Sequence, residues 1–110
     1  MQLAARVGET LVGVVDLYNY DPLNHRAEVG IVVDSQYRHQ GHGKAILLEL
    51  DRYVQQHLAL HQLYCDILDA NTLSQALFSH CGYTLCGTFA EWVTDAQGNY
   101  RTVLRYQKMI

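Results

Sequence analysis

The stretch YRHQGHGKAIL, residues 37–47, decides how the chain is interpreted. It follows an apolar run, precedes a helical pattern, and places Gly41 and Gly43 one residue apart. Glycine has no Cβ, so it allows either a tight turn or the close approach of another group to the backbone. The unpaired N–H groups at a helix start bind phosphate, and Arg38 and Lys44 add positive charge on either side. On its own, however, a G-x-G pair indicates a simple turn more often than a ligand site.

Two familiar phosphate-binding loops are excluded by the residues after the glycine pair. Ile46 stands where the dinucleotide-binding fingerprint requires a third glycine. Ala45 follows Lys44, whereas the P-loop requires serine or threonine after its lysine. The rest of the sequence must therefore decide what the glycines do.

Composition narrows the class of protein. With 110 residues and 49% hydrophobic residues, the chain is expected to form one domain over 1–110. The net charge of −3 argues against a nucleic-acid partner. No apolar run is long enough for a membrane span or a secretory signal. The three cysteines form no C-x-x-C pair, so we expect reduced thiols and a cytoplasmic location.

Hydrophobic periodicity predicts the order β-β-β-α-β-α-β-β. Residues 18–26 contain Asp21-Pro22 and Asn24 and are expected to form a loop. The second helix starts at Asn71 or Thr72 and is ended by Gly82. The expected strands cover residues 3–7, 11–17, 27–33, 62–68, 83–93 and 100–110. The first helix covers residues 42–59, and a turn at residues 94–99 joins the last two strands. This order predicts a mixed α/β, or α+β, sheet with helices packed on it.

Apolar positions at helical spacing predict which helix faces enter the core. In the first helix they are Ile46, Leu50, Tyr53, Val54 and Leu58. In the second they are Leu73, Ala76, Leu77 and Cys81. Cys81 is expected to pack in the core rather than to act as a nucleophile.

The segment NTLSQALFSHCGY, residues 71–83, together with RHQGHG, resembles the GNAT superfamily of acyl-CoA-dependent N-acyltransferases. Arg38, Gly41 and Gly43 match that family's glycine loop. The residues that match its later helix motif are Asn71, Ala76, Leu77, Gly82 and Tyr83. The ending, residues 87–110, looks like the closing hairpin of the subgroup that acetylates spermidine or ribosomal-protein N-termini.

The resemblance implies a mixed, mostly antiparallel sheet that splays at its centre and is flanked by helices. It also implies transfer of an acetyl group from acetyl-CoA to a primary amine, by direct attack in a ternary complex. The pantetheine arm would pair with the strand at Ile31, Val32 and Val33, and one strand amide would polarise the thioester carbonyl. The pyrophosphate would lie on Arg38, His39, Gln40, Gly41, His42, Gly43 and Lys44, with Asn71 and Phe78 as further coenzyme contacts.

The reaction requires a base that takes a proton from the amine. Glu28 is the candidate because it is the only acid in the strand RAEVGIVV. Its alternative role is an exposed edge glutamate that pairs with Arg26 or another cation. Glu91, beside Trp92, is a second candidate base or a recognition group for a cationic amine, although a solubilising surface role is the stronger alternative.

The chain departs from the family pattern at two places. Phe78 stands where the family usually has the tyrosine that protonates the leaving thiolate, so Tyr83, Tyr64, Cys81 or solvent would have to replace it. The strand and two helices that normally precede the segment matching residues 3–17 are missing. Either the chain is N-terminally truncated or a partner chain completes the site.

Several alternatives stay open at this point. A non-catalytic acyl-CoA-binding or dimerisation module would keep the glycine loop without a complete acceptor site, and a different nucleotide-binding domain would bind ATP or NAD. We expect a homodimer. The acceptor is a small amine, a polyamine or a protein N-terminus. Tyr18 and Tyr20 either line the acceptor pocket or cover the core. The histidines, including His57 and His61, lack convincing ligand spacing, so no metal is expected.

Overall fold

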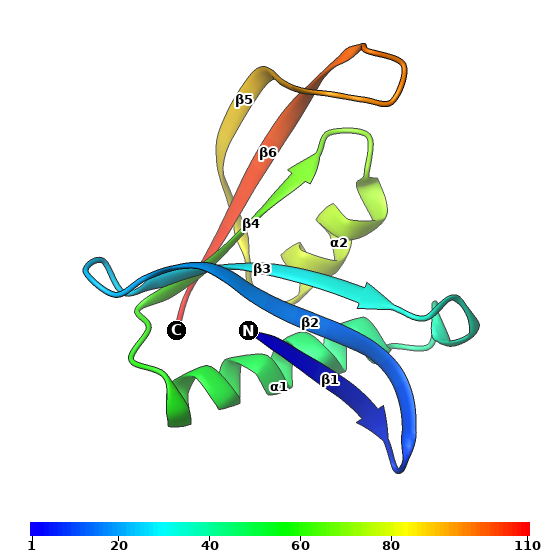
Figure 1. Ribbon diagram of the computed structural model, residues 1–110, viewed down its shortest axis with the longest axis vertical. Coiled ribbons are helices and arrows are strands. Elements are labelled where there is room, and N and C mark those ends of the chain that lie inside the picture. The colour runs from blue at the N-terminus through cyan, green and yellow to red at the C-terminus, as the bar shows by residue number, and fades with distance from the viewer.

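A computed structural model describes residues 1–110 as one six-stranded sheet with two helices behind it (Figure 1). The strand order is β1-β2-β3-β4-β6-β5. In chain order the elements are β1 (Gln2–Val7), β2 (Thr10–Asp21), β3 (Arg26–Val33), the 3₁₀ turn η1 (Ser35–Tyr37), α1 (His42–His57), β4 (Gln62–Leu68), α2 (Thr72–His80), β5 (Thr84–Thr94) and β6 (Tyr100–Met109). The expected order and the mixed, mostly antiparallel sheet are confirmed.

One strand pair in the sheet is parallel, and it is the pair joined by helix α1. All other neighbouring strands run antiparallel, and β5 and β6 form the predicted hairpin. A parallel connection requires a crossover, and α1 supplies it between β3 and β4. The loop that carries the glycine pair therefore lies at the entry to this crossover.

Both helices pack on the same face of the sheet and share one core. Leu47, Leu50 and Val54 of α1 join Phe78 and Cys81 of α2 in a single buried cluster with the inward side chains of β2, β3, β4 and β6. In Figure 1 the strands lie in front of the helices, so the viewer looks onto the opposite face. That face has no helix over it. Neither helix is long and apolar enough to cross a lipid bilayer.

The structure corrects three local expectations. Strand β2 continues to Asp21, so the loop covers only residues 22–25. In α1 the core includes Leu47, which the spacing did not select, and Leu58 lies just after the helix in an extended conformation. In α2, Leu73 is 71% exposed, whereas Phe78, which the spacing did not select, is 3% exposed; Cys81 is buried and Leu77 packs against the core, as the spacing predicted.

A partly buried ion pair joins both helices to β6. The Lys108 ammonium donates to Asp51 of α1 and, at 2.6 Å, to the carbonyl of Cys81 at the end of α2. The second Asp51 oxygen is buried without a partner, and the whole residue is only 9% exposed. A carboxylate in this position depends on Lys108 for its compensation.

We expect Lys108→Met to lower the free energy of unfolding by about 3 kcal/mol, because it leaves a buried carboxylate without a cation. Urea denaturation measures the change. The matched control is Arg52→Met, which breaks the exposed Arg52–Glu49 pair on α1, the helix that carries Asp51. This variant should lower the free energy of unfolding by less than about 1 kcal/mol. Equal losses in the two variants would contradict the assigned role of Lys108.

The cysteines should differ in reactivity although all three are free. Burial raises the pKa of the Cys65 thiol to about 12 and also raises the pKa of Cys81, so both thiols stay protonated near pH 8. Cys86 is exposed. We therefore expect iodoacetamide at pH 8 to modify Cys86 alone in the folded chain and all three cysteines in urea, as measured by mass spectrometry. Modification of Cys81 in the folded chain would show that the α2 end opens readily.

Candidate functional site

The candidate site begins where β3 and β4 separate. The two strands pair only from Arg26–Gln62 to Glu28–Tyr64, after which β4 continues alongside β6 and β3 continues alongside β2. Residues 29–33 therefore have no strand on the side that faced β4. The backbone groups on that side are open to pairing with an extended ligand.

A groove of about 510 Å³ lies beside this open edge of β3. It is bounded by β3, the loop before α1 and the start of α2, and we call this space the wedge. Its volume falls within the range of about 300–1,000 Å³ that is usual for ligand sites. The residues that line it are Ile31, Val32, Val33, Tyr37, Arg38, His39, Gly41, His42, Gly43, Lys44, Asn71, Leu73, Ser74 and Leu77. The structure thus brings together all of the expected coenzyme residues except Gln40 and Phe78.

The two glycines have different tasks. Gly41 precedes α1 with φ +81°, a left-handed conformation that glycine adopts without strain, and nothing lies within 4 Å of the place where a Cβ would be. Gly43 instead allows close packing, because a Cβ there would lie 3.1 Å from Cδ2 of Leu77 in α2. The first glycine makes the turn, and the second brings α1 against α2.

The entrance of the groove carries positive charge and free amides. No side chain caps the N-terminus of α1, so its first N–H groups are available to a ligand. Arg38 and Lys44 lie on either side of them. The Arg38 Nε donates to the Val33 carbonyl at 3.0 Å, which ties the loop to the end of β3. Gln40 lies outside the groove, and its side chain donates to the Gln36 carbonyl at 3.1 Å.

Helix α2 contributes the opposite wall. Asn71 caps this helix by accepting a hydrogen bond from Ser74 N at 3.2 Å. Leu77 faces the groove, whereas its neighbour Phe78 packs in the core, edge-on to Tyr83 with 4.9 Å between ring centroids. The sequence predicted that Leu73 and Leu77 enter the core, but Leu73 is exposed, and Leu77 packs against the core while it also lines the groove. Their spacing of four residues marks one helix face but does not say what that face meets.

Glu28 lies at the point where β3 and β4 part, beside Tyr64 on β4. Its carboxylate accepts a hydrogen bond from the Asn19 side-chain amide at 2.9 Å. Arg26, the alternative partner considered for Glu28, pairs with Asp21 at 3.3 Å. Glu28 points to the uncovered face. Ile31, the first of the residues expected to pair with the pantetheine arm, lies about 10 Å further along the same strand.

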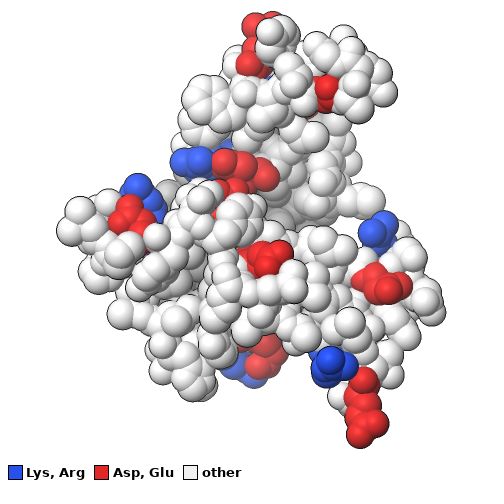
Figure 2. Space-filling view, viewed as in Figure 1, with Lys and Arg blue, Asp and Glu red and all other residues white.

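The uncovered face around Glu28 holds an aromatic and charged cluster that the sequence did not reveal. Arg105 makes a two-point ion pair with Asp66 at 2.7 and 2.9 Å, and its guanidinium lies over the rings of Tyr64 and Phe89. The hydrogen bonds and charge of Asp66 raise the pKa of Arg105 further. Figure 2 shows this face, on which charged side chains occur in small groups, some with both signs and some acidic only.

The groups considered as proton donors in place of Phe78 lie in different surroundings. Tyr83 is buried, its hydroxyl has no partner, and burial raises its pKa strongly. Cys81 is buried beside Lys108. Tyr64 is half-buried at the strand separation, next to Glu28. Among these three side chains, only Tyr64 reaches the uncovered face.

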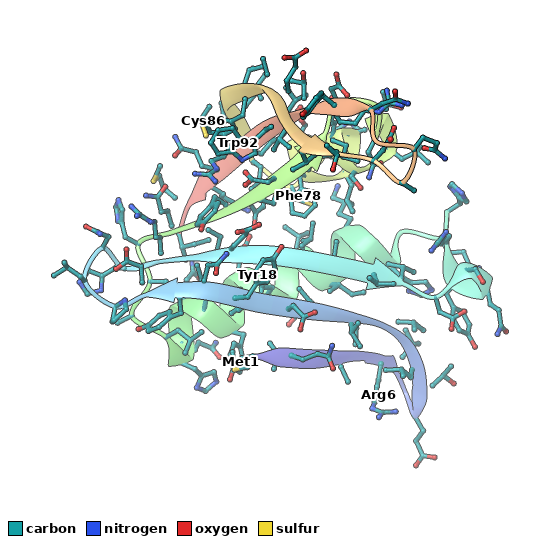
Figure 3. All side chains as sticks on the ribbon, turned by 45° about the horizontal axis from the view of Figure 1, so that its top comes forward. Met1, Arg6, Tyr18, Phe78, Cys86 and Trp92 are labelled. Carbon is teal, nitrogen blue, oxygen red and sulfur yellow. The ribbon has the colours of Figure 1, made fainter.

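Other singled-out residues lie away from the groove. Glu91 is exposed, with φ +50° at an irregularity of β5, and Trp92 beside it is 65% exposed and stacks on Phe89. Figure 3 shows the side chains of Trp92 and Cys86, both on β5, and Tyr18 over β2 and β3. No group of three or more histidine, cysteine, aspartate or glutamate side chains is arranged to hold a metal ion.

Comparison with solved structures gives similar folds. A spermidine N-acetyltransferase from Vibrio cholerae, in complex with CoA and spermine, has a TM-score of 0.90 and 21% identity over 98% of this chain and 64% of that chain. A ribosomal-protein-alanine N-acetyltransferase from Brucella melitensis has a TM-score of 0.87 and 27% identity over 99% of this chain and 68% of that chain. The chain therefore spans about two thirds of the length of these proteins.

The family comparison agrees with the fold. A search of curated proteins finds no match. The model of the acetyltransferase (GNAT) family matches residues 1–83, which include the glycine loop, the strand separation and helix α2. The chain belongs to the acetyltransferase (GNAT) family, whose members are acetyl-CoA-dependent transferases.

Proposed function

We propose that this chain transfers the acetyl group of acetyl-CoA to a primary amine, by direct attack in a ternary complex. The observation that carries the proposal is the groove, in which an unpaired strand edge, a glycine loop and two cations line one continuous space. An extended chain that ends in a pyrophosphate fits this combination. The strand edge offers backbone partners, and the loop amides and cations offer partners for phosphate.

Acetyl-CoA would supply an activated acetyl thioester, and the chain's own residues would do the rest. Amides of Ile31–Val33 would hold the pantetheine arm, and one of them would polarise the carbonyl. Glu28 would take a proton from the amine as the C–N bond forms and the C–S bond breaks. The thiolate would then take a proton from Tyr64 or solvent, since Phe78 has none to give.

The acceptor is proposed to be a small amine, a polyamine or a protein N-terminus. Its support is the similarity to a spermidine N-acetyltransferase and a ribosomal-protein-alanine N-acetyltransferase. It would approach Glu28 from the uncovered face, where the strands part. We further propose a cytoplasmic homodimer, and sedimentation of the purified chain would measure its mass.

One observation favours a second candidate, a non-catalytic acyl-CoA-binding module. Phe78 stands where the family usually has an acidic tyrosine, and its ring lies in the core. Such a module would bind acetyl-CoA in the same groove without turning it over. An amine screen with bound acetyl-CoA therefore separates the two candidates.

We expect acetyl-CoA to bind with micromolar affinity in isothermal titration, and Lys44→Glu to weaken that binding about tenfold because it reverses a charge beside the expected pyrophosphate. Arg52→Glu is the matched control, since it reverses an exposed charge of the same helix away from the groove. Equal affinity of the two variants, or equal competition by ATP and NAD, would count against the glycine loop as a coenzyme site.

We expect Glu28→Gln to lower kcat by about 100-fold or more, because glutamine cannot accept the amine proton, while the Kd for acetyl-CoA stays unchanged. Steady-state kinetics and titration on the same sample measure both. Glu91→Gln provides the comparison. If Glu91→Gln lost activity and Glu28→Gln kept it, the base would be Glu91.

A further inference from the structure

Strand β2 contains a bulge next to the residue pair that includes the candidate base. Tyr18 pairs with Glu28 and Asp21 pairs with Arg26, so Asn19 and Tyr20 together oppose the single residue Ala27. Two residues against one is the arrangement of a β-bulge, which redirects side chains and is frequent beside active sites. Here the bulge interrupts the strict alternation of side chains just after Tyr18.

Asn19 occupies the bulge with φ +51°, a left-handed conformation that is uncommon for residues other than glycine. Asparagine tolerates this conformation better than most side chains do. Without the bulge, the residue after Tyr18 would point toward the helices, because Tyr18 lies on the uncovered face and successive strand residues alternate. With the bulge, the Asn19 amide reaches the Glu28 carboxylate at 2.9 Å.

We propose that Asn19 is a positioning residue that holds the Glu28 carboxylate for proton transfer. This rests on the proposed function, in which Glu28 is the base. The Asn19 amide occupies Oε1 of Glu28. The second oxygen of the carboxylate then has a fixed direction from which to accept the proton of the amine. A displacement of about 1 Å in a reacting group costs up to about 100-fold in rate, so fixing this direction matters.

Tyr18, the residue before Asn19, lies opposite Glu28 in the strand pair. Burial, followed by interaction with the Glu28 carboxylate, raises the pKa of Tyr18 to about 12, so its hydroxyl keeps its proton throughout the usual assay range. Besides Tyr18, the titratable groups that interact with the charge of this carboxylate are Tyr64, Cys65 and Arg105.

Glycine is an informative replacement at position 19 because it accepts the left-handed backbone without strain and removes the side chain that carries the amide. Aspartate also tolerates this backbone but replaces the donor by a second negative charge. If Asn19 positions Glu28, kcat should fall in the order wild type, Asn19→Gly, Asn19→Asp. We expect a loss of about tenfold for Asn19→Gly and a larger one for Asn19→Asp.

The experiment is steady-state kinetics with acetyl-CoA and an accepted amine, with the Tm and the acetyl-CoA Kd of each variant recorded. We expect kcat to fall in both Asn19 variants while KM for acetyl-CoA, Kd and Tm stay within error. The matched control is Asn24→Gly. Asn24 lies in the adjoining loop, and its side-chain amide donates to Asp21 and not to Glu28. Crystal structures of the Asn19 variants should show the Glu28 carboxylate in more than one orientation.

Each outcome separates the two proposals. Wild-type kcat in both Asn19 variants, with Glu28→Gln inactive, would overturn the role of Asn19 and leave the proposed function intact. A loss of kcat that parallels a fall in Tm, and that is not larger for Asn19→Asp than for Asn19→Gly, would also overturn the positioning role. Asn19 would then only stabilise the backbone of the bulge. No transfer to any amine by the wild type would overturn the proposed function and the positioning role with it.

Discussion

Strands β3 and β4 stay paired for only three residues each, and the rest of the structure depends on their separation. Beyond Glu28 and Tyr64, β3 follows β2 and β4 follows β6. A sheet that continued without interruption would satisfy its backbone internally and leave no groove. Because the strands part, residues 29–33 have one unpaired side although β3 is the third strand of a six-stranded sheet.

The wedge is kept open by contacts behind it. Helix α1 enters the crossover at Gly41, and Gly43 lets it pack against Leu77 of α2. At the other side of the core, Lys108 connects Asp51 of α1 with the end of α2. The two helices are thus fixed to each other and to β6. A larger residue at position 43 would separate the helices and change the width of the groove.

Local patterns in the sequence predicted the elements well but not their partners. Alternation and helical spacing predicted the strand and helix order, and the capping residue Asn71 and the hairpin turn were located closely. The Asp21-Pro22 pair suggested a loop from residue 18, yet Asp21 still belongs to β2, because tertiary pairing with Arg26 extends the strand. The bulge at Asn19 could not be predicted from the sequence, because an asparagine in this segment is just as compatible with an ordinary turn.

The candidate site shows the same division. The turn and helix start at the glycines were predicted from sequence because their chemistry is local, whereas their use as a coenzyme site stays a prediction that rests on the family resemblance. The partners of Glu28 were not, since Asn19 and Tyr64 meet it only through strand pairing across the chain. Phe78 is buried in the core, whereas the adjacent Leu77 packs against the core and also lines the groove. Spacing alone could not orient that helix.

The glycine pair illustrates why a short motif needs its surroundings. Gly41 is explained by the turn it makes, and Gly43 by the helix it packs against, so neither requires a ligand. What distinguishes this loop from an ordinary helix start is the strand beside it. The open edge of β3 ends at Val33, whose carbonyl accepts from Arg38, and Arg38 leads directly into the glycines. Unpaired strand amides and unpaired helix amides are thereby joined along one groove. An extended molecule that ends in phosphate satisfies both sets at once, which a simple turn does not.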